Sequence, residues 1–159
     1  MAAILPSLKI DDDAQLLRWF MKHQATWIMD DSRMLLAEKS VRIGWTYADG
    51  FKNVRKRLRH NKRDYLFCTK DQRSAIEYME TCMKFAEIFD FSRSILSHGE
   101  DSVQVEAEDD AGKKFTEEVK FGFIKFDNGS RIIAFSANPY AMAVFEGDVG
   151  LDEFAKHKQ

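Results

Sequence analysis

The sequence predicts an α/β fold in which helices flank a sheet that gains antiparallel strands in its second half. Three observations predict it. The first half of the chain alternates short apolar runs with longer segments of helical periodicity. The second half holds strand-like segments separated by turn residues. A last apolar run, Val149–Leu151, ends in the adjacent carboxylates Asp152 and Glu153.

The first half is expected to contain helices and short buried strands in alternation. Residues 13–29 carry apolar side chains at mostly helical spacing after an acidic start, and residues 34–37 form an apolar run consistent with a buried strand. A helix is expected after Thr46, and Tyr65–Thr69 is expected to be a second buried strand. The helix that follows carries an apolar stripe made of Ile76, Met79, Met83 and Ala86.

The helix after Thr46 is expected to run into a strongly basic stretch. Its apolar face consists of Tyr47, Phe51, Val54 and Leu58, and Gly50 weakens the helix by about 1 kcal/mol relative to alanine. The cations that crowd its end are Arg55, Lys56, Arg57, Arg59, Lys62 and Arg63. They could contact nucleic-acid phosphates, or they could form a solvated helix end whose charge suits the helix dipole. The sequence favours neither interpretation.

Strands joined by turns are expected in the second half. Residues 102–107 alternate, and residues 109–112 have the composition of a turn. Asn128-Gly129 favours a hairpin because both residues tolerate positive φ. The strand that follows is expected to end at Pro139, which acts as a breaker together with the asparagine before it. The strands expected on either side of the hairpin turn are 121–126 and 131–136.

Composition limits the class of protein. The 159 residues fit a single domain, and 45% hydrophobic with 31% charged residues is globular composition. No apolar run approaches the roughly 20 residues of a membrane span, and the start of the chain does not have the pattern of a secretory signal. Cys68 and Cys82 suggest neither a zinc site nor a disulfide framework. We therefore expect a cytoplasmic protein without a membrane partner.

The segment before the helix at Thr46 has features of an altered phosphate loop. Such a loop needs glycine near the phosphates, a cation for the β and γ phosphates and a hydroxyl for Mg²⁺, in the pattern G-x-x-x-x-G-K-[ST]. Gly44 and Thr46 match its end, whereas Lys39 stands at the first glycine and Trp45 at the lysine. Lys39 and Arg42 still bring positive charge. The alternative is an ordinary turn between a strand and a helix.

The Asp152-Glu153 pair has the chemistry of a hydrolase that uses Mg²⁺. Successive side chains on a strand point to opposite faces, so one carboxylate can face the metal and the other the attacking water. Asp152 would hold Mg²⁺ through water, and Glu153 would orient or deprotonate the nucleophile. The alternative is a solvated strand end. The two segments occur in the order expected of an NTP-hydrolysing core.

Taken together, three blocks of sequence resemble the ATPase domain of phage terminase large subunits, the motors that package viral DNA, and in particular those of Mu-like prophages. The blocks are Gln24–Arg33, Ala37–Thr46, and Ser136–Pro139 running on to Gly147–Ala155. The resemblance implies a phosphate-loop NTPase-like fold with a mostly parallel sheet and antiparallel strands in its second half.

The resemblance also implies roles for individual residues. Several terminases carry a deviant phosphate loop with lysine at its start, which matches Lys39. Nucleotide-binding residues are then Gln24, as the adenine-reading glutamine, with Lys39, Ser40, Gly44, Trp45 and Thr46. Glu153 and Arg42 are expected to be catalytic, the arginine by stabilising the transferred phosphoryl group, and Thr46 and Asp152 are expected to hold Mg²⁺.

Partners follow from the resemblance as well. ATP and Mg²⁺ are the expected substrate and cofactor, and double-stranded DNA, the capsid portal, a small terminase subunit and a homo-oligomeric ring are expected in the bacterial host cytoplasm. Residues 1–159 are expected to be one partial ATPase domain without the nuclease domain, with weak ATP binding and with slow turnover or none by itself. Ala143-Val144 stands where related sequences often have Arg-Gly. Two alternatives remain: a helicase-like ATPase, and a non-catalytic nucleotide- or DNA-binding remnant of a prophage gene.

Overall fold

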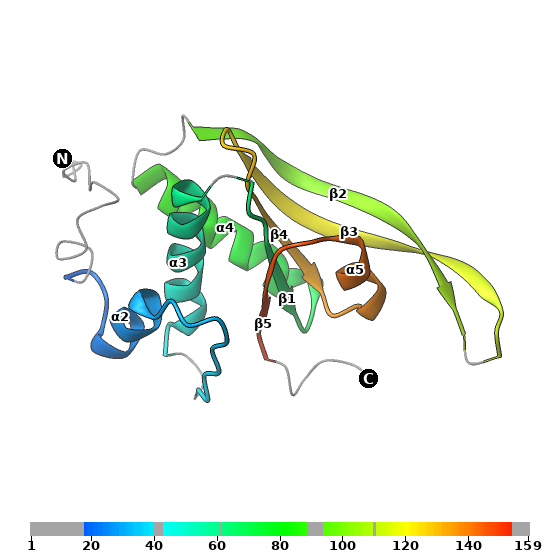
Figure 1. Cartoon of the computed structure of the whole chain (residues 1–159), viewed down its shortest axis with the longest axis horizontal. Coiled ribbons are helices and arrows are strands. Elements are labelled where there is room, and N and C mark those ends of the chain that lie inside the picture. The colour runs from blue at the N-terminus through cyan, green and yellow to red at the C-terminus, as the bar shows by residue number, and fades with distance from the viewer. Residues whose placement is uncertain (1–17, 40–42, 61, 89–93, 110, 154–159) are drawn as a thin grey trace.

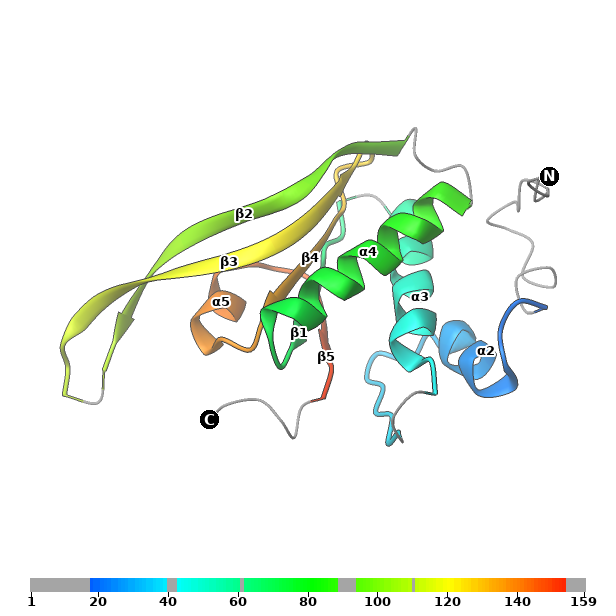
Figure 2. The same ribbon diagram turned by 180° about the vertical axis from the view of Figure 1, so that it is seen from behind.

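A computed structural model of the chain describes residues 18–39, 43–60, 62–88, 94–109 and 111–153. Its sheet has five strands in the order β2-β3-β4-β1-β5. Helices α3 and α4 cover one face of the sheet and α5 packs on the other, while α2 lies against α3 (Figure 1, and from behind in Figure 2). The elements are α2 (Lys22–Met29), α3 (Trp45–Arg59), β1 (Tyr65–Thr69), α4 (Gln72–Ile88), β2 (Ile95–Glu108), β3 (Lys114–Phe126), β4 (Arg131–Ser136), α5 (Pro139–Val144) and β5 (Asp148–Leu151).

The sheet is mixed. Strand β1 pairs in parallel with β4 on one side and β5 on the other, whereas β2 with β3 and β3 with β4 are antiparallel. The predicted α/β class is confirmed, but the expectation of a mostly parallel sheet is wrong, because only two of these four pairings are parallel. The cause is local: Gly129 takes φ 84° in a tight turn that folds β4 straight back onto β3. Beyond the sheet, β2 and β3 continue as a long two-stranded arm (Figure 1).

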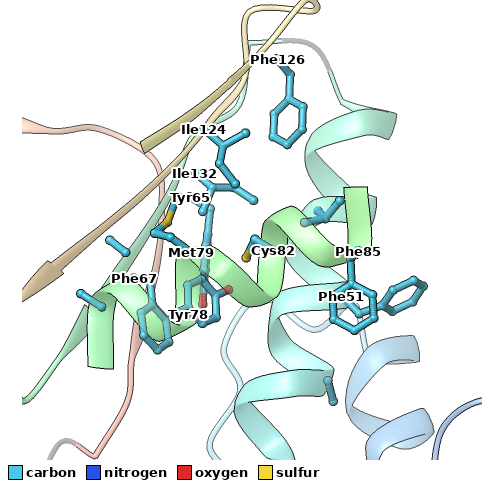
Figure 3. Close-up of a cluster of buried hydrophobic side chains, with 14 of the residues drawn as sticks. Phe51, Tyr65, Phe67, Tyr78, Met79, Cys82, Phe85, Ile124, Phe126 and Ile132 are labelled. Carbon is cyan, nitrogen blue, oxygen red and sulfur yellow. The ribbon is translucent and has the colours of Figure 1, made fainter. Parts of the chain in front are cut away.

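Strand β1 lies inside both hydrophobic cores. All five of its residues are buried, and because side chains alternate along a strand, Tyr65 and Phe67 face α4 whereas Leu66 and Cys68 face α5. Phe67 stacks on Tyr78 of α4 with ring centroids 3.6 Å apart. Figure 3 shows this core between the sheet and the two helices. Such a strand reads as a continuous apolar run, and the prediction of a buried strand at 65–69 is confirmed.

A buried carboxylate joins three helices to β1. Asp49 of α3 is 2% exposed. Its Oδ1 accepts a hydrogen bond from Trp27 Nε1 of α2 at 3.0 Å, and its Oδ2 accepts from Tyr65 at 2.9 Å and from Tyr78 of α4 at 3.1 Å. Burial raises the pKa of Asp49, and the three donors oppose that rise. Figure 3 shows the two tyrosine side chains close together in the core.

A fully buried arginine anchors the edge strand β5. Arg57 of α3 donates from Nη1 to the carbonyl of Asp64 at 2.6 Å and from Nη2 to Asp148 Oδ2 at 2.7 Å. The other oxygen of Asp148 accepts from Arg63 Nη2 at 2.8 Å. Arg55 is also buried, with 7% exposure. The basic stretch is therefore not simply a solvated helix end or an exposed phosphate-binding surface, because two of its arginines lie inside the protein.

Two segments near the amino terminus differ from expectation. Residues 34–37 are not a buried strand: Met34 is 87% and Leu36 94% exposed, and no strand is assigned there. A short apolar segment forms a strand only when a neighbouring strand pairs with it, and none of the described strands pairs with residues 34–37. The helix expected over 13–29 begins at Lys22 within the described residues, and positions 13–17 of that prediction lie outside them.

Residues that usually interrupt regular structure have definite places in this fold. A Cβ on Gly50 would lie 3.2 Å from Thr81 Cγ2, so this glycine lets α3 and α4 approach closely, which offsets its cost to the helix. Strand β4 ends at Ser136, as predicted from Asn138-Pro139, and the same two residues also begin α5. The Asn138 side chain accepts a hydrogen bond from the backbone N–H of Tyr140 at 2.8 Å, and proline suits the first helical position.

Replacing Arg57 by alanine is expected to destabilise the protein by roughly 3 kcal/mol, because it leaves Asp148 and the Asp64 carbonyl without their buried donor. Equilibrium unfolding in urea measures the change. Arg73→Ala is the control, since the Arg73 side chain is 89% exposed and forms an ion pair with Glu77 one turn along its own helix; its effect should stay within about 0.5 kcal/mol. Equal destabilisation by both variants would contradict the anchoring role.

The Asp148 ion pairs make stability depend on pH. Burial raises the pKa of Asp148, but hydrogen bonds from Arg63 and Arg57 outweigh that effect and hold the pKa below its usual value. The stabilisation is therefore present above the unfolded pKa of about 3.9 and is lost as the pH falls through the lower folded pKa. The difference in urea midpoint between wild type and Asp148→Asn should shrink from pH 6 to pH 2.5. A constant difference would count against this account.

Candidate functional site

Three of the described residues predicted to bind nucleotide and Mg²⁺, Lys39, Thr46 and Asp152, meet at one end of the sheet. Strands β1 and β5 are parallel neighbours, so their carboxyl ends lie side by side, which is where α/β sheets carry their sites. Asp152 directly follows β5, and its backbone N–H donates to the carbonyl of Cys68 at 2.9 Å, which extends the pairing by one residue. Helix α3 begins beside it at Trp45.

Asp152 joins the two halves of the site. Its side chain is mostly buried, and Oδ1 accepts a hydrogen bond from Lys39 Nζ at 2.5 Å, across 113 positions of sequence. Its Oδ2 accepts from Thr46 Oγ1 at 3.2 Å. The Lys39 ammonium also lies 4.6 Å from the centre of the Trp45 ring, a cation–π arrangement. A cation and a hydroxyl from the altered loop thus converge on the carboxylate that follows β5.

Gly44 and Gln24 hold the start of α3. Gly44 is the N-cap residue and takes φ 72°, in the left-handed region that favours glycine. A Cβ there would lie 2.5 Å from Gln24 Nε2. That Nε2 donates to the Gly44 carbonyl at 3.1 Å, while Gln24 Oε1 accepts from the Met21 N–H at 3.0 Å. The amide of Gln24 thus contacts backbone on both sides, and its role toward adenine remains a prediction.

Trp45 connects the site with the buried carboxylate of the core. Its ring packs on Trp27 at 4.9 Å, and Trp27 donates to Asp49. The Nε1 atom of Trp45 is buried without a hydrogen-bond partner in the described part of the chain. A buried donor without a partner is costly, so a ligand that accepted from it would gain affinity. Trp45 therefore presents a hydrogen-bond donor at the start of α3.

Glu153 has a partner that sequence reasoning missed. Its Oε2 lies 2.8 Å from the Nζ of Lys70, and its backbone N–H donates to Asp152 Oδ1 at 2.9 Å. The hydrogen bond that the Lys70 ammonium donates to Glu153 raises the pKa of Lys70. Lys70 is the first residue after β1. Its place after a buried strand is visible in the sequence. The pairing of that strand with Val149–Leu151, which brings Lys70 to Glu153, is not.

A cavity of about 340 Å³ opens beside these side chains. It lies between the start of α3, the end of β1 and the first turns of α4. Its polar walls contain hydroxyl and carboxylate groups, the oxygen donors that suit a hard cation. The lining residues include Thr46, Thr69, Lys70, Ser74, Asp152 and Glu153.

The remaining predictions concern two loop residues, a metal site and a membrane span. Ser40 and Arg42 lie outside the described residues, so their proximity to Asp152 stays a prediction. Within the described part of the chain, no three His, Cys, Asp or Glu side chains form a metal-holding group by themselves. No helix there is long and apolar enough to cross a membrane.

Comparison with known proteins gives two relatives. The chain is 33% identical over 143 residues to the probable terminase, large subunit gp28, of Escherichia phage Mu, a match that covers 87% of this chain and 24% of that protein. It is 28% identical over 158 residues to the Mu-like prophage FluMu protein gp28 of Haemophilus influenzae, which covers 98% of this chain and 28% of the relative. No protein-family model and no solved structure matches the chain.

The chain thus spans about a quarter of the length of the relatives it matches. Similarity over nearly all of this chain, to two proteins of the same kind, indicates common descent rather than a shared short motif. The resemblance noted in the sequence is confirmed at this level. The chain is homologous to the probable terminase large subunit gp28 of phage Mu and to protein gp28 of the Mu-like prophage FluMu, over the part of those proteins that it covers.

Proposed function

We propose that this chain is the ATP-binding and ATP-hydrolysing part of a viral DNA-packaging motor. The observation that carries the proposal is the convergence of Lys39 and Thr46 on Asp152, across more than a hundred positions. The alternative interpretations, an ordinary turn and a solvated strand end, do not predict these contacts. Homology to a probable terminase large subunit supports the same function.

The residues at this site fit a magnesium–nucleotide complex. Thr46 Oγ1 and the Asp152 carboxylate are oxygen ligands of the kind Mg²⁺ prefers, and Mg²⁺ usually keeps several waters and binds through few protein groups. Thr46 would bind the metal directly and Asp152 through water. Lys39 would hold the β and γ phosphates, and the N-terminal end of α3 would add its backbone N–H groups. Bound Mg²⁺ would neutralise part of the phosphate charge.

The reaction follows from these positions. Glu153 would accept a proton from water as the water oxygen attacks the γ phosphorus. The bond between the γ phosphorus and the bridging oxygen breaks, and its electrons stay with ADP. Arg42 would stabilise charge on the transferred phosphoryl group. Trp45 Nε1 is a further donor available to the phosphates.

The larger assembly is proposed from homology alone. Double-stranded DNA, a portal, a small terminase subunit and a ring of identical subunits would be the partners of the longer protein. The described basic stretch does not favour a separate DNA-binding function for this chain, because Arg57 and Arg55 are buried in the fold. The alternative is a non-catalytic nucleotide-binding module, which would bind ATP without turnover.

Lys39→Ala is expected to weaken binding of fluorescently labelled ATP, measured with Mg²⁺ by titration, by about tenfold or more, because it removes the cation from the phosphates. Asp152→Asn should weaken the Mg²⁺-dependent part of the affinity. Lys22→Ala, at an exposed position on α2, is the control and should bind as wild type does. Equal affinity of Lys39→Ala and wild type would refute the site.

Glu153→Gln is expected to lower the rate of hydrolysis by about 10²-fold or more while ATP affinity stays within about threefold, because the amide cannot accept the proton. Single-turnover assays with radiolabelled ATP and excess protein detect slow hydrolysis. Glu80→Gln, exposed on α4, is the matched control. ATP binding without any hydrolysis by wild type would favour the non-catalytic module.

A further inference from the structure

The strand pairing places Lys70 directly beside Glu153. In the parallel register of β1 and β5, Cys68 is opposite Leu151. Lys70 and Glu153 each lie two residues beyond this last pair, and their side chains form an ion pair of 2.8 Å. The ion pair thus links the two segments that leave the carboxyl ends of β1 and β5.

The contact closes off one oxygen of the proposed base. Glu153 Oε2 is buried, although the side chain as a whole is a quarter exposed, and the Lys70 ammonium lies against it. An oxygen without access to solvent cannot accept a proton from an attacking water. Both side chains nevertheless line the cavity that also contains Thr46 and Asp152. The carboxylate is therefore close to its place of action but turned toward β1.

The backbone at Glu153 is held in an uncommon conformation. Its φ is 50°, in the left-handed region that residues with a Cβ seldom occupy. Such a conformation persists only where surrounding contacts hold it, and here those contacts include the Lys70 ion pair and the hydrogen bond from the Glu153 N–H to Asp152 Oδ1. Loss of the Lys70 contact would let the residue relax and the carboxylate reorient.

We propose that Lys70 is a positioning residue that restrains Glu153, and that hydrolysis requires the release of this ion pair. The inference rests on the proposed ATPase function. Lys70 acts on the rate through Glu153, while Lys39 and Thr46 act on nucleotide binding. The two roles are therefore separable in kinetics: removal of the Lys70 charge changes kcat and leaves KM close to its original value.

The test compares Lys70→Met, which keeps the length of the side chain and removes the charge, with Lys70→Arg, which keeps the charge. Single-turnover hydrolysis should be about fivefold or more faster in Lys70→Met, with the concentration dependence on ATP unchanged within about twofold. Lys70→Arg should stay near the wild-type rate. Lys84→Met, exposed on α4, is the control. A Lys70→Met rate equal to or below wild type overturns the proposal.

A second measurement is independent of turnover. Unfolding of wild type, Lys70→Met, Glu153→Gln and the double variant forms a double-mutant cycle, in which the ion pair predicts non-additive effects and additive effects contradict it. The two proposals also fail differently. ATP binding that depends on Lys39, without faster hydrolysis in Lys70→Met, leaves the nucleotide site in place and overturns the restraint. Loss of all ATP binding refutes the proposed function itself, and the restraint with it.

Discussion

The candidate site depends on the ion pair between Arg57 and Asp148. Strand β5 has only four residues and lies at the edge of the sheet, where β1 is its one partner among the described strands. A strand this short forms few backbone hydrogen bonds, and it buries little apolar surface, since Val149 and Leu151 remain 47% and 41% exposed. Arg57 holds the first residue of β5, and Asp152 follows the last. An anchor at one end of the strand therefore determines where the carboxylates stand at the other.

The same helix that supplies Arg57 also begins at the loop proposed to bind phosphate. Asp49, one turn beyond Trp45, ties α3 to α2, α4 and β1 through Trp27, Tyr78 and Tyr65. Tyr65 in turn packs over Gly150 of β5, where any side chain would collide with its hydroxyl. The loop and the carboxylate strand are thus positioned by one helix and one central strand. This explains how residues more than a hundred positions apart meet within hydrogen-bond distance.

Much of the fold was predictable, because periodicity and turn chemistry are local. The strands at 65–69 and 131–136, the helix at α4 and the Asn128-Gly129 turn follow from them. Lys39, Thr46 and Asp152 were predicted as one site and lie together. The exposed run at 34–37 and the ion pairs of Arg57 and Lys70 were not predictable, since each depends on which strands become neighbours. A charge in a basic stretch looks the same in sequence whether it is buried or solvated.

The contact between Lys39 and Asp152 has a physical explanation. Under the proposed function, a lysine five positions before Gly44 replaces one immediately after it only if its ammonium reaches the phosphates. The Lys39 ammonium lies over the Trp45 ring and donates to Asp152, so the tryptophan at the position of the usual lysine supports the Lys39 side chain. The ring is held in turn by Trp27 and through it by Asp49. The position of the Lys39 ammonium thus depends on contacts in the core, which a search by sequence pattern alone does not detect.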